Sequence, residues 1–154
     1  MDHREKAAEL FLSGSNCAQA VMVAFCDVTG LEPGFAAKLS SSFGGGMGRM
    51  REVCGAVSGM LMVAGLLYGY EEPGEGDCNK KAHYALVQHL AGQFREEVGS
   101  IVCREILKNP PSDPNPTPRT AEFYAKRPCS LMVMTAAGIL DAYIAGHPLE
   151  ARNG

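Results

Sequence analysis

The chain has 154 residues, of which 46% are hydrophobic and 20% are charged, so its composition predicts one globular domain over residues 1–154. The formal net charge of −3 lacks the basic footprint of a nucleic-acid-binding protein and argues against that class. The first ten residues, MDHREKAAEL, are polar and carry no secretory signal pattern, so we expect a reducing, cytoplasmic setting.

Apolar residues recur with helical rather than strand spacing, and the apolar stretches are rich in alanine, leucine and methionine. Glycine commonly follows a helix and proline commonly begins one, so Gly30, Pro33 and Gly99 mark helix boundaries, and Ser100 is the expected cap of the next helix. The predicted fold class is all-α, a compact single-domain helical bundle. In chain order, the predicted helices cover residues 3–13, 16–29, 33–43, 51–69, 78–98, 100–108 and 128–145.

The stretch FGGGMGRMRE, residues 43–52, is rich in glycine but does not fit a phosphate-binding loop. It lacks the Gly-Lys-Ser/Thr ending, and Arg49 stands where the dinucleotide fingerprint needs glycine. The favoured interpretation is a flexible turn between two helices. A backbone nest that holds an anion beside Arg49 and Arg51 is the less favoured alternative.

The next stretch, residues 53–70, is uncharged over 18 residues and is the candidate for a membrane span. Four glycines and Ser58 make it only moderately apolar, and no flanking pattern of basic and aromatic residues supports a span. A helix that is apolar on every side also suits the centre of a bundle. We therefore predict a buried central helix at about 51–69 and no membrane association.

The segment NPPSDPNPTP, residues 109–118, holds five of the nine prolines and is predicted to be an extended, solvated loop. A plain connector is favoured over a lid or a partner-binding segment.

Six cysteines in a cytoplasmic protein suggest metal binding or redox chemistry rather than structural disulfides. Four of them, Cys17, Cys54, Cys103 and Cys129, fall in or near the first turn of a predicted helix. The positive end of a helix dipole stabilises a thiolate, which is the form that attacks disulfides and binds metals.

The remaining two cysteines are predicted to be bystanders. Cys78 follows the cap candidate Asp77 and therefore also lies at a helix start, but in a polar, exposed turn. Cys26 lies late in its predicted helix. No CxxC pair is present, so the thioredoxin-like and zinc-ribbon signatures are absent.

The chain resembles the C_GCAxxG_C_C family through NCAQAV at Cys17, FGGGMG, CGAVSG at Cys54, and single cysteines at Cys103 and Cys129. Cys54, Gly55, Ala56 and Gly59 match the Cys-Gly-Ala-x-x-Gly motif, and the resemblance extends from about Ala7 to Leu140. The resemblance implies redox activity at these four cysteines and names no substrate. A related domain joined to a cytochrome, for which an iron–sulfur site has been suggested, keeps cluster binding open.

Together these features predict a redox-active cysteine protein, a possible thiol-based oxidoreductase, in which Cys17, Cys54, Cys103 and Cys129 converge. Cys54 or Cys103 is the expected attacking thiolate. One alternative is an iron–sulfur or zinc module that uses the same four cysteines as ligands. Another is a structural or partner-binding helical protein with inert cysteines. The cysteine pairing and the electron or thiol partner stay open, as does assembly into a homo-oligomer.

Overall fold

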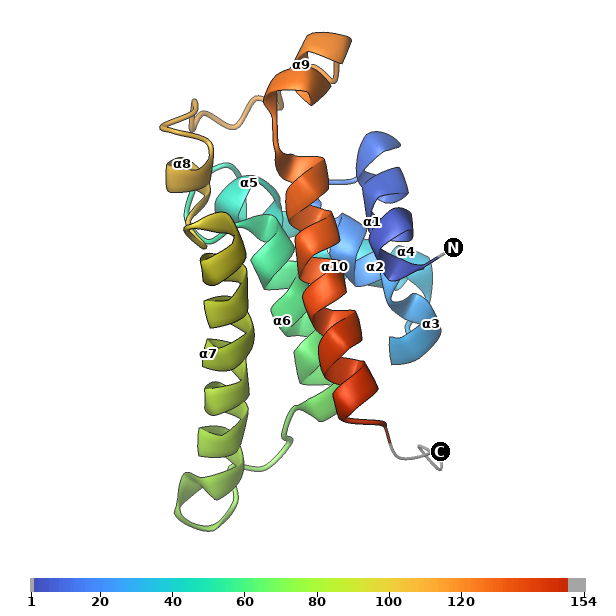
Figure 1. The fold of residues 1–154 in the computed structure, drawn as a ribbon, viewed down its shortest axis with the longest axis vertical. Coiled ribbons are helices and arrows are strands. Elements are labelled where there is room, and N and C mark those ends of the chain that lie inside the picture. The colour runs from blue at the N-terminus through green and yellow to red at the C-terminus, as the bar shows by residue number, and fades with distance from the viewer. Residues whose placement is uncertain (1, 150–154) are drawn as a thin grey trace.

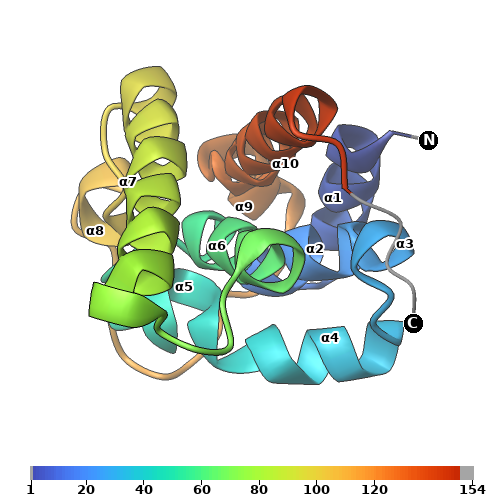
Figure 2. The ribbon, with the colours of Figure 1, turned by 90° about the horizontal axis from the view of Figure 1, so that it is seen from below.

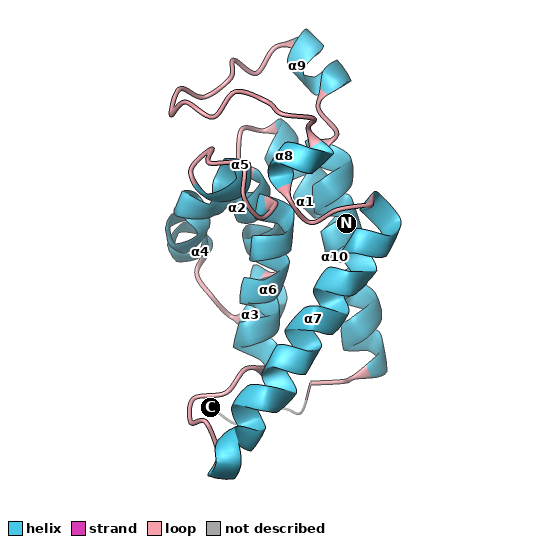
Figure 3. Ribbon diagram, turned by 90° about the vertical axis from the view of Figure 1, so that its left-hand side faces the viewer, coloured by secondary structure: helices cyan, strands magenta, loops and turns pink. Residues whose placement is uncertain are grey.

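The structure of the protein is a computed structural model that describes residues 2–149. Helices dominate it, and the described residues contain no strand beyond a single bridge between Val53 and Val102 (Figures 1 and 3). The all-α prediction is therefore confirmed. The longer helices are α1 (His3–Leu12), α2 (Cys17–Ala24), α4 (Pro33–Ser40), α6 (Gly55–Tyr68), α7 (Cys78–Val98) and α10 (Cys129–Gly146). The short ones are α3 (Cys26–Thr29), η1 (Ser41–Phe43), α5 (Gly44–Met47), η2 (Glu75–Asp77), α8 (Cys103–Ile106) and α9 (Ala121–Lys126).

Helix α6 lies at the centre of the bundle, as the uncharged stretch predicts. It packs against α2, α5, α7 and α10, and Figure 2 shows it enclosed by its neighbours. Its Val57, Met60 and Val63 side chains are fully buried in the hydrophobic core. Burial on several sides explains why this helix needs no polar face.

Two glycines let α6 approach α2 closely. A Cβ atom on Gly59 would lie 2.8 Å from the carbonyl oxygen of Ala18, and one on Gly55 would lie 3.1 Å from the backbone nitrogen of the same residue. These distances are shorter than a normal van der Waals contact. The glycines of the CGAVSG motif therefore set the separation between α2 and α6 near the cysteines.

The predicted start of the central helix is wrong by about four residues. Residues 51–54 are not helical, because their backbone pairs with residues 101–104 instead. The Cys54 N–H donates to the Ile101 carbonyl at 2.7 Å, and the Cys103 N–H donates to the Glu52 carbonyl at 2.6 Å. The helix begins only at Gly55, after this pairing ends.

The glycine-rich segment forms a compact left-handed turn rather than a loose connector. Backbone φ is positive at every residue from Gly45 to Arg49 and again at Arg51. The Arg51 N–H donates to the Gly45 carbonyl at 3.2 Å, and the Glu52 N–H donates to the Gly46 carbonyl at 2.9 Å. This turn, which includes α5, places Arg51 and the rest of the 51–54 segment beside α8.

Other boundaries differ locally from the prediction. The helix predicted over 16–29 is interrupted at Phe25, so that Cys26 begins the short α3 rather than lying late in one long helix. The helix predicted over 100–108 shrinks to α8, and Ser100 does not cap it, because its hydroxyl accepts from the Val102 N–H two residues away.

Helix α9 is absent from the prediction. Its signals are Thr120, whose hydroxyl accepts from the Phe123 N–H at 3.2 Å, and an ion pair between Glu122 and Lys126 at 2.7 Å. Both are typical of a short helix.

Helix α10 is the one described helix that is long and apolar enough to cross a membrane by length and composition alone. It packs against α1, α2, α6 and α7 in the structure (Figure 1). The uncharged stretch predicted to be the candidate span forms the shorter α6.

Candidate functional site

Four of the six cysteines line one small inner cavity of about 30 Å³. They come from four separate parts of the chain and are Cys17, Cys54, Cys103 and Cys129. A cavity of this size accommodates about one or two water molecules. Cys26 and Cys78 do not line it; Cys78 is exposed and Cys26 is half-buried. The structure thus brings together the cysteines that the sequence groups, and separates the two others from them.

Helix starts place Cys17 and Cys129 at the cavity. Cys17 is the first residue of α2 and lies within a capping box, in which the Asn16 side chain accepts from the Gln19 N–H and the Gln19 side chain accepts from the Asn16 N–H. Cys129 is the first residue of α10 and follows Pro128. These two helix ends meet because α10 packs against both α1 and α2.

The bridge between Val53 and Val102 places the other two cysteines. Cys54 precedes α6 and Cys103 begins α8, one on each side of the bridged pair. Gly46 makes this approach possible, since a Cβ atom there would lie 2.7 Å from the Cβ atom of Cys103. Both cysteines are buried, with exposed fractions of 6%.

Cys17 and Cys129 are neighbouring thiols whose pKa values shift in opposite directions. The hydrogen bond from Cys17 lowers the pKa of Cys129 to about 7, with further help from the positive charges of Arg127, Arg119 and Arg51. The same bond, together with burial, raises the pKa of Cys17 well above its ordinary value. Cys129 is therefore the more acidic thiol of the pair and Cys17 the less acidic one.

Burial dominates at Cys54. It raises the pKa of this thiol to about 12, although the backbone N–H groups of Ala56 and Val57 at the start of α6 act in the opposite direction. The expected role of Cys54 as the attacking thiolate is therefore opposed by desolvation. Cys103 receives a contact from the Arg51 guanidinium, whose Nη1 lies 3.7 Å from its Sγ.

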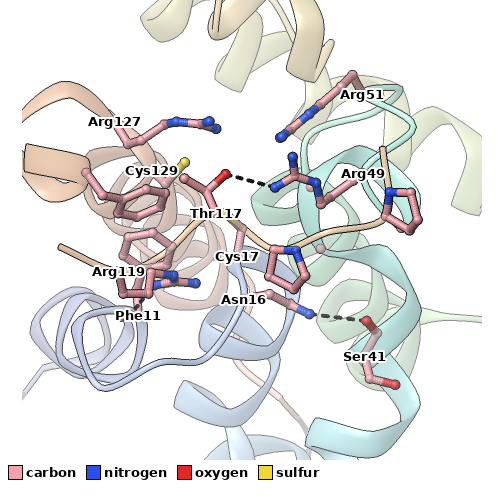
Figure 4. A pocket seen from close by; sticks show the side chains of 16 residues that line it. Phe11, Asn16, Cys17, Ser41, Arg49, Arg51, Thr117, Arg119, Arg127 and Cys129 are labelled. Atoms are coloured by element: carbon pink, nitrogen blue, oxygen red, sulfur yellow. Dashed lines mark hydrogen bonds between the residues drawn. The ribbon is translucent and has the colours of Figure 1, made fainter. Parts of the chain in front are cut away.

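A larger outer pocket of about 310 Å³ adjoins the cysteines and shares Cys17, Cys129 and Arg51 with the inner cavity. Figure 4 shows Arg51 and Arg127 extending toward one another from opposite sides of it, near the sulfur of Cys129. No acidic residue stands among the described residues that line this pocket. Its four basic side chains are Arg49, Arg51, Arg119 and Arg127.

The proline-rich loop forms one wall of the outer pocket rather than a free connector. Arg49 holds it by donating from Nε to the Asp113 carbonyl at 2.8 Å and from Nη1 to the Thr117 hydroxyl at 2.9 Å. Arg51 donates from Nε to the Pro111 carbonyl at 2.9 Å. Sequence reasoning missed this wall, because nothing local indicates that a solvated loop returns to a turn some 60 residues earlier.

The sequence also did not identify Arg119 and Arg127 as site residues. Arg119 donates to the carbonyls of Phe11 and Ser15 and lies over the Phe11 ring, 4.4 Å from its centroid. Arg127 lies 5.4 Å from the centroid of Phe123. Their only sequence signal is proximity to Cys129, and two isolated arginines near a cysteine are not a recognisable motif.

The described residues contain no group of three or more cysteine, histidine or acidic side chains arranged to hold one metal ion. All six cysteines are free thiols in the structure. The donor geometry therefore gives no support to zinc or iron–sulfur ligation at the four cysteines, which stays a prediction from the residue types.

The fold and site together define an all-helical protein with four cysteines gathered beside an arginine-lined pocket. Residues 15–143 match the family described as "Putative redox-active protein (C_GCAxxG_C_C)", and the chain belongs to that family. No curated protein and no solved structure shows a significant match to the chain.

Proposed function

We propose that this protein is a thiol–disulfide redox protein whose reactive pair is Cys17 and Cys129. The observation that carries the proposal is that these two cysteines, and no other described cysteine, line both the inner cavity and the arginine-lined outer pocket. The family description as redox-active is consistent with it. Cys129 is the attacking residue, because it is the more exposed of the two and stands among positive charges.

In the forward direction, the Cys129 thiolate attacks one sulfur of a partner disulfide. A Cys129–partner disulfide forms, the partner's sulfur–sulfur bond breaks, and one partner thiolate leaves. Cys17 then attacks the Cys129 sulfur, passes its proton to the departing second partner thiolate, and forms the Cys17–Cys129 disulfide. The partner gains two electrons and leaves as one thiolate and one thiol, the latter carrying the Cys17 proton, and the protein loses the same two electrons.

The acidity of Cys17 fits its role as the resolving thiol. Its pKa is raised first by its hydrogen bond to Cys129, then by burial, and also by the Cys129 charge. The first and third of these causes depend on the negative charge at Cys129. Once Cys129 is in the mixed disulfide, that charge is gone. Cys17 therefore becomes easier to deprotonate at the step where it attacks.

The test is to oxidise the reduced protein with a limiting disulfide reagent, block free thiols, and map the peptides by mass spectrometry. We expect a Cys17–Cys129 disulfide that is lost in Cys129→Ser and kept in the control Cys26→Ser. Failure to recover any disulfide that contains Cys129 would overturn the proposal.

Metal analysis of protein purified without oxygen tests the alternative function. Iron with sulfide, or zinc, in a stoichiometric amount that is lost in Cys17→Ser and Cys129→Ser but kept in Cys26→Ser would favour a metal module. The thiol–disulfide proposal expects no stoichiometric metal.

A further inference from the structure

We infer that the outer pocket binds a small disulfide or thiol that carries carboxylate groups and presents its sulfur to Cys129. The binding part of this inference rests on the arginines, and only the step at sulfur rests on the proposed function. The argument begins with charge. The chain as a whole carries −3, yet the outer pocket gathers four arginines and no acidic residue among its described lining residues.

Arg51 is the strongest indication that a ligand belongs there. Its exposed fraction is 4%, and its Nη2 is buried without a hydrogen-bond partner among the described residues. Its Nε and Nη1 are occupied by the Pro111 carbonyl and the Cys103 sulfur. A buried guanidinium with an unused donor is costly unless something accepts that hydrogen bond, and an anion in the adjoining pocket would do so.

Arg127 faces the same space from the opposite side (Figure 4). It contacts the Phe123 ring and forms no ion pair within the described part of the chain. Arg127 can bind a carboxylate through two nitrogens, whereas Arg51 adds a single bond from Nη2, so the two arginines together suit a ligand that carries carboxylates.

The other two arginines are already engaged. Arg49 is held by the proline-rich loop, and Arg119 by the Phe11 and Ser15 carbonyls. Arg49 also pairs with the Asp113 carboxylate at 3.9 Å, so its charge is partly offset, while Arg119 contributes fixed positive charge to the wall and Arg51 and Arg127 keep donors available.

The position of Cys129 indicates that the ligand also carries a reactive sulfur. The pocket is lined by both Cys17 and Cys129 and by the apolar surfaces of Phe11, Phe123 and the loop prolines. Its volume of about 310 Å³ suits a small organic ligand better than a protein segment. An anion held by the arginines would have its sulfur close to the attacking thiolate.

The reaction of this ligand is the balanced exchange already described. The disulfide of the small molecule accepts two electrons and leaves as two carboxylate-bearing thiols, while the Cys17 and Cys129 dithiol becomes a disulfide. Run in reverse, the same small thiols reduce the protein.

Three small disulfides that differ in charge test the inference on the intact protein. The probes are oxidised glutathione, which is anionic, hydroxyethyl disulfide, which is neutral, and cystamine, which is cationic. We expect the second-order rate constant for oxidation of Cys129 to be about tenfold or more higher with glutathione disulfide than with the neutral probe, lowest with cystamine, and the preference to weaken with salt.

The variant Arg127→Gln sharpens the test. Arg127 also influences the Cys129 thiolate, so the measured quantity is the ratio of the anionic to the neutral rate constant, in which that influence cancels. The ratio should fall severalfold in Arg127→Gln and stay at the wild-type value in Arg95→Gln, which removes the same charge from an exposed position on α7. Equal ratios in all three proteins would overturn the inference.

Binding without chemistry separates this inference from the proposed function. Calorimetry with S-methylglutathione, which has the carboxylates but no reactive sulfur, should show binding to Cys129→Ser and weaker binding to Arg127→Gln. Binding with no disulfide exchange in the wild type would overturn the proposed function and support the anion site. Absence of binding together with no charge preference would overturn the inference.

Discussion

At the scale of single residues, Cys54 directly precedes α6 and Cys129 is the first residue of α10, yet the pKa values of these two thiols move in opposite directions. Burial raises the pKa of Cys54 to about 12, whereas the hydrogen bond from Cys17 lowers the pKa of Cys129 to about 7. A helix N-terminus alone therefore does not make a thiolate. The hydrogen-bond donor and the arginines around the sulfur decide the outcome.

Alkylation against pH measures this difference. The thiolate reacts, so the Cys129 rate should rise with pH through a midpoint near 7, where about half of the thiol is ionised. Cys54 should stay unmodified in the native protein up to pH 9, because its pKa of about 12 leaves it protonated there. Peptide mass spectrometry after timed labelling gives both rates. A Cys129 midpoint at the ordinary value of about 8.5 would contradict the expectation.

At the scale of elements, the contact between α2 and α6 depends on small residues. A Cβ atom added to Gly59 would touch the backbone of Ala18, whereas one added to Gly65, on the same helix, would point into open space. The two glycines therefore have opposite consequences for stability, although both lie inside α6.

Replacing Gly59 by alanine should destabilise the protein by about 1–3 kcal/mol, because the new methyl group forces the helices apart or strains the backbone. Gly65→Ala should stabilise it by up to about 1 kcal/mol, since alanine is the better helix former and nothing obstructs it. Urea unfolding of the reduced proteins gives both free energies. If Gly59→Ala instead stabilised the protein, the result would contradict the close approach of α2 and α6.

The pairing of residues 51–54 with 101–104 is the second element on which the site depends. It requires Gly46, where φ is +70° and a side chain would meet both Cys103 and the Glu52 backbone. We expect Gly46→Ala to destabilise the protein by about 1–3 kcal/mol. It should also increase labelling of Cys103, measured by mass spectrometry, because the segment that covers it is displaced. Gly76→Ala is the control, since its φ is also positive but nothing lies nearby.

At the scale of the whole molecule, Cys17 and Cys129 join the first third of the chain to its last helix. A disulfide between them would close a loop of more than 100 residues and restrict the unfolded chain. Oxidation should therefore raise the thermal midpoint by on the order of 5–10 °C. Calorimetry of oxidised and reduced protein measures the difference. Cys17→Ser should abolish it and Cys26→Ser should keep it, and a shift that persists in Cys17→Ser would contradict the assigned pair.

The sequence by itself determined the helical class, the central apolar helix, and most helix ends marked by a local signal. Gly30, Pro33 and Gly99 act within one turn of their own position, so a single chain reveals them. It also grouped Cys17, Cys54, Cys103 and Cys129, through helix starts and a family resemblance rather than through any spacing that shows contact.

Only the tertiary structure decided what these cysteines face. Helix α6 begins at Gly55, later than predicted, because residues 51–54 pair with a segment about 50 residues away. The helix propensity of residues 51–54 carries no information about that distant segment. The acidity of Cys54 depends mainly on desolvation, and that of Cys129 depends also on positive charges that include Arg51, which is distant in sequence. Burial and electrostatic fields are properties of assembled surroundings, so they arise only once α2, α6, α8 and α10 meet.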